Sequence, residues 1–242
     1  MRALACATLA LSLLAGCAAP GAHDARVSAD AYRSLLASAL RTERDRGIDE
    51  RRHPVELLQF ADVRPGMHVL DVAAGGGYTS QLLALAVGPS GKLWAQTPNP
   101  GAALNDRLAK QPQANFIVAK RPFDDPVPPE AASLDVVTLI LNYHDISYLP
   151  IDRDAMNRRI FAALKPGGRY IVVDHSALPG TGISAGKTLH RIEEAFVVAE
   201  VRKAGFVLDG EGAFMRNPAD NRAESSEPPK LTDKFVLRFV KR

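Results

Sequence analysis

The chain has 242 residues and a formal net charge of +3, with 46% hydrophobic and 24% charged residues. This balance suits one globular domain with a full hydrophobic core and excludes a disordered chain. The basic excess is too small and too evenly spread to indicate a nucleic-acid partner. The two cysteines, Cys6 and Cys17, lie near the N-terminus, which excludes a disulfide, a thiolate metal site or a cysteine nucleophile from the rest of the chain.

The first residues are typical of a secretory signal. Arg2 supplies a basic start, and the apolar run from Ala3 to Leu14 is shorter than the roughly 20 residues that a membrane-spanning helix needs. Leu14-Ala15-Gly16-Cys17 resembles the lipobox of bacterial lipoproteins, in which the signal is cut before a cysteine that carries the lipid. Residues 1–16 are therefore predicted to be a lipoprotein signal peptide. The alternative is a chance cysteine in a plain signal peptide or in an N-terminal anchor.

Residues 17–29 are predicted to form the lipidated Cys17 and a tether, and residues 30–242 the folded domain. The resemblance implies an exported protein that a lipid holds at the periplasmic face of the inner or the outer membrane. Because no polybasic patch is evident, membrane attachment would depend on the acyl chains. The sequence leaves the choice of membrane and the oligomeric state open.

The domain begins with two helical patterns. Apolar residues at helical spacing predict a helix over 31–41, and Pro54 starts a second one that runs to Phe60. The charged segment 41–46 between them is interpreted as a solvated helix end.

From Val69 onward, strands and helices alternate. Apolar runs predict strands over 69–73, 92–97, 115–120, 134–143, 170–174, 206–210 and 234–240. Helices are predicted over 78–87, 102–110, 152–164 and 185–204. This alternation indicates βαβ units and a mostly parallel sheet. The last two strands have no helix between them and are expected to pair antiparallel at the edge of the sheet.

The stretch Val69-Leu70-Asp71-Val72-Ala73-Ala74-Gly75-Gly76-Gly77-Tyr78 is an apolar strand with an acid, then a glycine turn, then a helix start. Glycine allows the backbone to approach a ligand closely, and the free amides at a helix start attract an anionic group. A dinucleotide-binding fold offers a similar turn, so this stretch alone does not decide the family.

A second stretch, Leu164-Lys165-Pro166-Gly167-Gly168 between a predicted helix and an apolar strand ending at Asp174, resembles a signature of class I methyltransferases. These enzymes use S-adenosylmethionine, and the order of elements fits them from Pro54 onward. The resemblance implies a three-layer, Rossmann-like α/β fold with a mostly parallel seven-stranded sheet and an antiparallel last strand. It also implies methyl transfer from S-adenosylmethionine to a small molecule or an envelope component.

The family pattern for the cofactor carries over unevenly. It places Asp71 and the glycine turn at the amino-acid part of the cofactor, although Ala73 replaces the usual first glycine. Gln96 stands where the family has a carboxylate for the ribose hydroxyls, and it offers only an uncharged acceptor. Asp124 or Asp125 is expected at the adenine. The residues assigned to the cofactor are Asp71, Ala73, Gly75, Gly76, Gly77, Tyr78, Gln96, Asp124 and Asn142.

Polar clusters follow the fourth and fifth predicted strands, at Asn142-Tyr143-His144-Asp145 and at Asp174-His175-Ser176. Ligands of an open parallel sheet bind beyond the carboxyl ends of its strands, so the two clusters are expected to converge. Transfer of a methyl group to a hydroxyl or an amine needs a group that removes the proton of the acceptor. The predicted catalytic residues are His144 as the first candidate base, His175 as the second, and Asp145 beside them. Alternatively, each histidine only caps a strand end or binds a loop.

No residue is assigned as a metal ligand, but two other functions stay open. Asn142, Asp145, Asp174 and His175 loosely resemble the ligands of catechol-type O-methyltransferases, which would make the chain a metal-dependent enzyme. The missing ribose carboxylate favours instead a non-methylating protein that binds another ligand on the same fold.

Two further segments have no assigned role. His190 and Glu194 share a face of the predicted helix over 185–204 and are interpreted as a surface pair. The polar run 219–230 either folds over the site or lies exposed.

Overall fold

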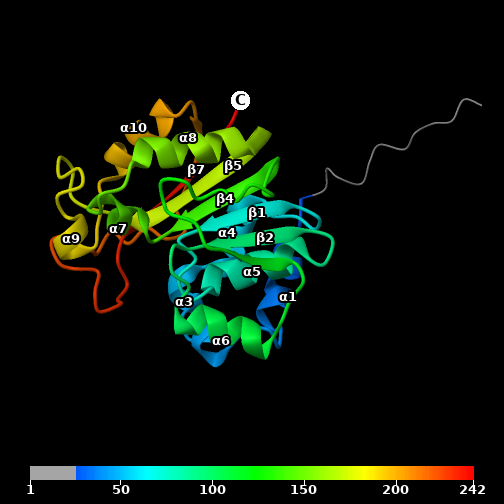
Figure 1. The fold of residues 1–242 in the computed structure, drawn as a ribbon. Helices are drawn as coiled ribbons and strands as arrows, with labels where there is room; N and C mark the ends of the chain where they lie inside the picture. The colour runs from blue at the N-terminus through cyan, green and yellow to red at the C-terminus, as the bar shows by residue number, and fades with distance from the viewer. Residues whose placement is uncertain (1–25) are drawn as a thin grey trace, which may run out of the picture.

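The computed structural model describes residues 26–242, so the predicted signal peptide, the lipobox with Cys17 and most of the tether lie outside the described residues. Across the described range, none of the helices has the length and apolar character needed to cross a membrane. The chain forms three layers, with one sheet between two groups of helices (Figure 1).

The seven strands pair in the order β3-β2-β1-β4-β5-β7-β6. Their bounds are β1 His68–Val72, β2 Lys92–Gln96, β3 Phe116–Ala119, β4 Leu134–Ile140, β5 Leu164–His175, β6 Val207–Gly212 and β7 Lys234–Val240. Strands β1 to β5 pair in parallel, whereas β7 lies antiparallel between β5 and β6. The predicted sheet is confirmed, and its strand order reverses between β1 and β4.

Ten helices surround the sheet in the described range: α1 Ala29–Leu36, α2 Glu43–Arg46, α3 Asp49–Arg52, α4 Pro54–Ala61, α5 Tyr78–Val87, α6 Ala102–Lys110, α7 Tyr143–Ser147, α8 Arg153–Ala163, α9 Gly186–Leu189 and α10 Glu194–Lys203. Figure 1 shows α8 and α10 over one face and α1, α5 and α6 over the other. Each face has its own buried apolar cluster. Strand β4 is buried along its whole length, as expected of a central strand that is covered on both faces.

The prediction of a solvated helix end for the charged segment 41–46 holds for its four exposed residues, 42–44 and 46, and is wrong for the other two. Arg41 and Asp45 are only 3% and 2% exposed. Arg41 pairs with Asp49, and Asp45 accepts two hydrogen bonds from Arg107 of α6, at 2.7 and 2.8 Å. These partners come from other segments, and their opposite charges allow the burial. The ion pairs fasten α2 and α3 beside the sheet.

The single helix predicted over 185–204 is also wrong, because the chain breaks between α9 and α10. His190 adopts a left-handed conformation with φ of 51°, and Ile192 then pairs with Ser176 as an isolated bridge. Glu194 forms an ion pair with Arg216 at 2.7 Å. The break turns His190 away from the face of Glu194, so the two do not form the surface pair expected from their spacing.

Candidate functional site

The glycine turn lies at the carboxyl end of β1, where the strand order reverses and folds of this type bind ligands. Ala73, Gly75 and Gly77 have left-handed φ values of 58°, 54° and 81°. Ala73 thus adopts the conformation for which the family uses glycine, at a cost of about 1–2 kcal/mol. Its N–H donates a 3.0 Å hydrogen bond to the side-chain oxygen of Gln96, which helps to hold the turn.

Asp71 ties the turn to the two neighbouring elements. The carboxylate accepts hydrogen bonds from the hydroxyls of Ser80 at 2.6 Å and Thr138 at 2.7 Å. It is 2% exposed, and its burial raises the pKa of Asp71 to about 6. Asp71 therefore lies directly under the turn, where its two partners come from α5 and β4.

Gln96 and Asp124 are not placed as the family pattern implies. The side chain of Gln96 is fully buried, and its amide donates a 2.6 Å hydrogen bond to the carbonyl of Arg121 while its oxygen accepts from Ala73. Both ends of this carboxamide thus serve the protein's own backbone. Asp124 lies half-buried in the turn after β3, outside the residues that line the hollow at the glycine turn.

A small hollow of about 110 Å³ opens at the turn, and Arg52 of α3 enters it. The hollow is lined by Arg52, Asp71, Ala73, Ala74, Gly75, Gly76, Tyr78, Thr79, Ile140 and Asn142. The amide of Asn142 donates to the carbonyl oxygen of Ala73 at 3.3 Å. The hydroxyl of Tyr78 donates to Asp49 at 2.7 Å. Most residues assigned to the cofactor therefore surround this one hollow.

Arg52 is a functional candidate that sequence reasoning missed. Its guanidinium lies 5.7 Å from the centre of the Tyr78 ring, and no acceptor among residues 26–242 takes a hydrogen bond from it. Burial removes part of the water around this cation and thereby lowers the pKa of Arg52. No local pattern marks Arg52 in the charged segment, because its position depends on the buried ion pairs of α2 and α3.

A second hollow, of about 290 Å³, lies at the tips of β4 and β5, and Arg52 also lines it. The three predicted catalytic residues His144, Asp145 and His175 come together here. The remaining lining residues are Arg51, Leu141, His190, Ser226, Glu227, Pro229, Lys230 and Lys234. Four of these belong to the polar run 219–230, so that run forms part of the wall. Figure 1 shows this orange-red segment beside α9.

Asp174 fixes the position of His144. One of its oxygens lies 2.6 Å from Nδ1 of His144 and accepts from the backbone N–H of His175, and the other accepts from the backbone N–H of His144. Asp174 is fully buried and surrounded by donors, so it acts as the acceptor and Nδ1 of His144 carries the proton. Nε2 of His144 then faces Asp145, at 3.3 Å.

The two histidines differ in charge at neutral pH. Burial lowers the pKa of His144, but Asp174 and Asp145 outweigh it and raise this pKa to about 10. Burial lowers the pKa of His175 to about 3, and Nδ1 of this ring lies 2.7 Å from the hydroxyl of Thr232. At neutral pH these shifts favour the protonated form of His144 and the neutral form of His175. The general base needs a neutral ring, so a role for His144 as base requires that it first lose its proton.

His190, interpreted from sequence as a surface residue, joins this group. Its Nδ1 lies 3.4 Å from the carboxylate of Asp145, and its ring meets the ring of His144 edge to face at 5.6 Å. Gly186 makes this approach possible, since a Cβ there would lie 2.8 Å from the hydroxyl oxygen of Ser147 and 2.9 Å from the carbonyl oxygen of His144. The position of His190 in the site thus depends on the close contact of α9 with α7, and no periodicity in the sequence predicts that contact.

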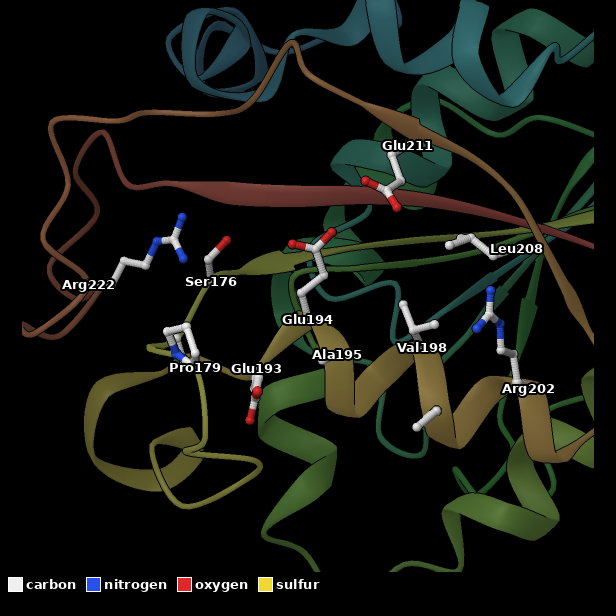
Figure 2. A pocket seen from close by; sticks show the side chains of 12 residues that line it. Ser176, Pro179, Glu193, Glu194, Ala195, Val198, Arg202, Leu208, Glu211 and Arg222 are labelled. Atoms are coloured by element: carbon white, nitrogen blue, oxygen red, sulfur yellow. The ribbon is translucent and has the colours of Figure 1, made fainter.

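A separate, open hollow of about 560 Å³ lies between α10 and β6 (Figure 2). It shares no lining residue with the hollow around His144. Two of its acidic side chains already have partners, because Glu193 accepts from the backbone amides of Gly180 and Gly182, and Glu194 pairs with Arg216. This hollow is therefore separate from the group of histidines and acids at the tips of β4 and β5.

Comparisons with known proteins agree with this architecture. No protein-family model matches the chain. It is similar to the ubiquinone/menaquinone biosynthesis C-methyltransferase UbiE of Burkholderia orbicola, with 32% identity over 122 residues. That match covers 48% of this chain and 46% of the relative, so the chain spans about half the length of this curated protein.

The structural similarity covers more of the chain. A SAM-dependent methyltransferase from Aquifex aeolicus superposes with a TM-score of 0.61 over 89% of this chain and 100% of its own, at 16% identity. The [4+2]-cyclase SpnF superposes with a TM-score of 0.58 over 79% of this chain and 80% of its own, also at 16% identity. The chain therefore has the Rossmann-like fold of the class I S-adenosylmethionine-dependent methyltransferases.

Proposed function

We propose that the chain is an S-adenosylmethionine-dependent methyltransferase that acts on a small molecule or an envelope component. The observation that carries this proposal is the guanidinium of Arg52, which donates no hydrogen bond within residues 26–242 and lies beside the left-handed glycine turn, at the point where the strand order reverses. The fold and the similarity to a named methyltransferase support it. The lipobox at Cys17 would hold the enzyme at the periplasmic face of a membrane.

The residues at the turn fit the amino-acid end of the cofactor. Arg52 and the amides of the exposed Gly75 and Gly76 suit a carboxylate, because a charged donor and a helix start both favour an anion. The hollow is smaller than the roughly 300 Å³ of an ordinary small-molecule site, so it suits this end alone. When bound, S-adenosylmethionine supplies an electrophilic methyl group on its sulfonium. The ribose end lacks its usual partner, because Gln96 is closed off by Ala73 and Arg121.

The hollow at the strand tips suits a polar acceptor. Its lining includes the basic side chains of Arg51, Lys230 and Lys234 and the acidic ones of Asp145 and Glu227, so an apolar chain would find few partners there. The polar side chains of His144, Asp145 and His175 would meet the polar groups of the acceptor and orient it. Because Arg52 lines both hollows, the two binding sites would adjoin at this side chain.

A second candidate is a non-methylating protein that binds another ligand in the same hollows. The buried Gln96 favours it, since the ribose of S-adenosylmethionine finds no free acceptor there. An exported domain would also need a supply of this cofactor outside the cytoplasm. The fold accommodates such a change, since the similar structure SpnF is named a cyclase.

Calorimetry with two ligands distinguishes these candidates. S-adenosylhomocysteine carries the amino-acid end, and 5′-methylthioadenosine has the same adenosine without it. Arg52→Ala should weaken the binding of S-adenosylhomocysteine by about 10- to 100-fold, the loss expected for one hydrogen bond between charged groups. The same variant should leave the binding of 5′-methylthioadenosine unchanged. Arg51→Ala is the matched control, because Arg51 lines the hollow at the strand tips and not the hollow at the glycine turn. If the wild type binds neither ligand at millimolar concentration, the non-methylating candidate stands.

A further inference from the structure

Three side chains at the strand tips present ligand atoms to a common point. Nε2 of His144, Nδ1 of His190 and a carboxylate oxygen of Asp145 all lie within 4.8 Å of one another. The carboxylate oxygen is 3.3 Å from the nitrogen of His144 and 3.4 Å from that of His190. We propose that these three residues, here called the His2Asp cluster, bind a divalent transition-metal ion of the zinc type.

The distances fit a tetrahedral ion. With metal–ligand bonds of about 2.0–2.1 Å, two ligands of a tetrahedron lie about 3.3–3.4 Å apart. Two edges of the His2Asp cluster already have this length. The third edge, between the two histidines, lies within 4.8 Å and must close to about 3.4 Å in a tetrahedral site. His190 can supply this movement, because its side chain is 34% exposed and stands at the end of the short α9.

The surroundings of His144 are those of a metal ligand. Asp174 accepts from Nδ1 at 2.6 Å, so Nε2 is the nitrogen left to bind an ion, which would displace the proton that Nε2 shares with Asp145. Carboxylates hold metal-binding histidines in this way and make them stronger ligands. The fourth position would open onto the hollow of about 290 Å³ and accept water or an oxygen of a ligand.

The donor types favour zinc or a similar ion over magnesium. Two imidazole nitrogens and one carboxylate suit zinc, cobalt or iron, whereas magnesium prefers oxygen ligands alone. This cluster differs from the set of four metal ligands that the resemblance to catechol-type O-methyltransferases suggested. The amide of Asn142 donates to the carbonyls of Ala73 and Ile140, and Asp174 is occupied by His144 and His175.

Cobalt titration tests the proposal directly. Untagged protein is dialysed against a chelator and titrated with Co²⁺, whose visible absorption is strong only in tetrahedral sites, and then with Zn²⁺ by calorimetry. We expect one ion per chain. His190→Ala should weaken Zn²⁺ binding by at least about 100-fold, and Asp174→Asn, which changes only the outer partner, by about 10- to 100-fold.

Controls make either result decisive. His53→Asn alters a histidine outside the cluster and should bind as the wild type does, since asparagine tolerates the left-handed conformation at this position, with its φ of 44°. If His190→Ala proves unfolded by circular dichroism, Asp145→Asn replaces it, because Asp145 is 37% exposed and the change keeps its size. Absence of Zn²⁺ and Co²⁺ binding at micromolar concentration, or equal binding by the folded His190→Ala or Asp145→Asn variant, would overturn the proposal.

Discussion

The carboxylate of Asp71 makes the fold sensitive to pH, and the size of this effect follows from its surroundings. The folded protein holds the pKa of Asp71 at about 6, against 3.8 for a free side chain, because the group is buried and only two hydroxyls donate to it. A difference of about two pKa units corresponds to about 3 kcal/mol, at about 1.4 kcal/mol per unit.

The sign of this contribution is destabilising at neutral pH. Below pH 3.8 both the folded and the unfolded chain hold the proton, and Asp71 contributes nothing. Between pH 3.8 and about 6 only the folded chain keeps it, so the free energy of unfolding falls as the pH rises. Above about pH 6 the loss is complete. Asp71→Asn carries no titrating proton and should lack this fall.

Urea unfolding at a series of pH values measures the effect, with the fluorescence of Trp94 as the signal. Trp94 is the single tryptophan, is 1% exposed and pairs with the strand that carries Asp71. The difference in unfolding free energy between the wild type and Asp71→Asn isolates this one group from all others. It should change by about 2.4 kcal/mol between pH 4 and pH 7. Asp106→Asn, at an exposed position, serves as the control. A difference that stays constant over this range would refute the reasoning.

Two further changes test the turn and the anchor. Gln96→Glu should lower the free energy of unfolding by about 1–3 kcal/mol, because a carboxylate would face the carbonyl of Arg121 where the amide now donates at 2.6 Å; chemical denaturation measures it, and a more stable variant would contradict the assigned contacts. Cys17→Ala should block lipid-dependent processing, as incorporation of a fatty-acid probe would show, and equal labelling of both forms would rule out the anchor.

The sheet could be predicted from sequence because its signals are local. Each strand is a short apolar run between turn residues. Helices α5 and α8 lie where the spacing of apolar residues predicted them. The turn from Ala73 to Gly77 and the clusters after β4 and β5 follow from the rule that ligands bind at the carboxyl ends of parallel strands. The left-handed Ala73 shows that a departure from the family motif can keep the same backbone conformation.

The remainder depends on contacts between distant segments. The burial of Arg41 and Asp45 needs Arg107 and Asp49, and nothing within residues 41–46 predicts those partners. The break at His190 likewise occurs where no proline interrupts the helical pattern. Contacts between distant segments also decide the roles of Gln96 and Arg52. The side chain of Gln96 is bonded to the backbone of Ala73 and Arg121, and α3 places Arg52 beside the glycine turn.

Strand β7 lies between β5 and β6, so an interior strand of the sheet follows the edge strand β6 in the sequence. Without residues 234–240, β5 and β6 have no shared neighbour, and neither has the partner that β7 provides. A chain cut before Lys234 would expose two unpaired edges that favour aggregation. The same final segment brings Thr232 to His175 and Lys234 to the wall of the site. The sheet and the wall of the site therefore depend on the same segment of the chain.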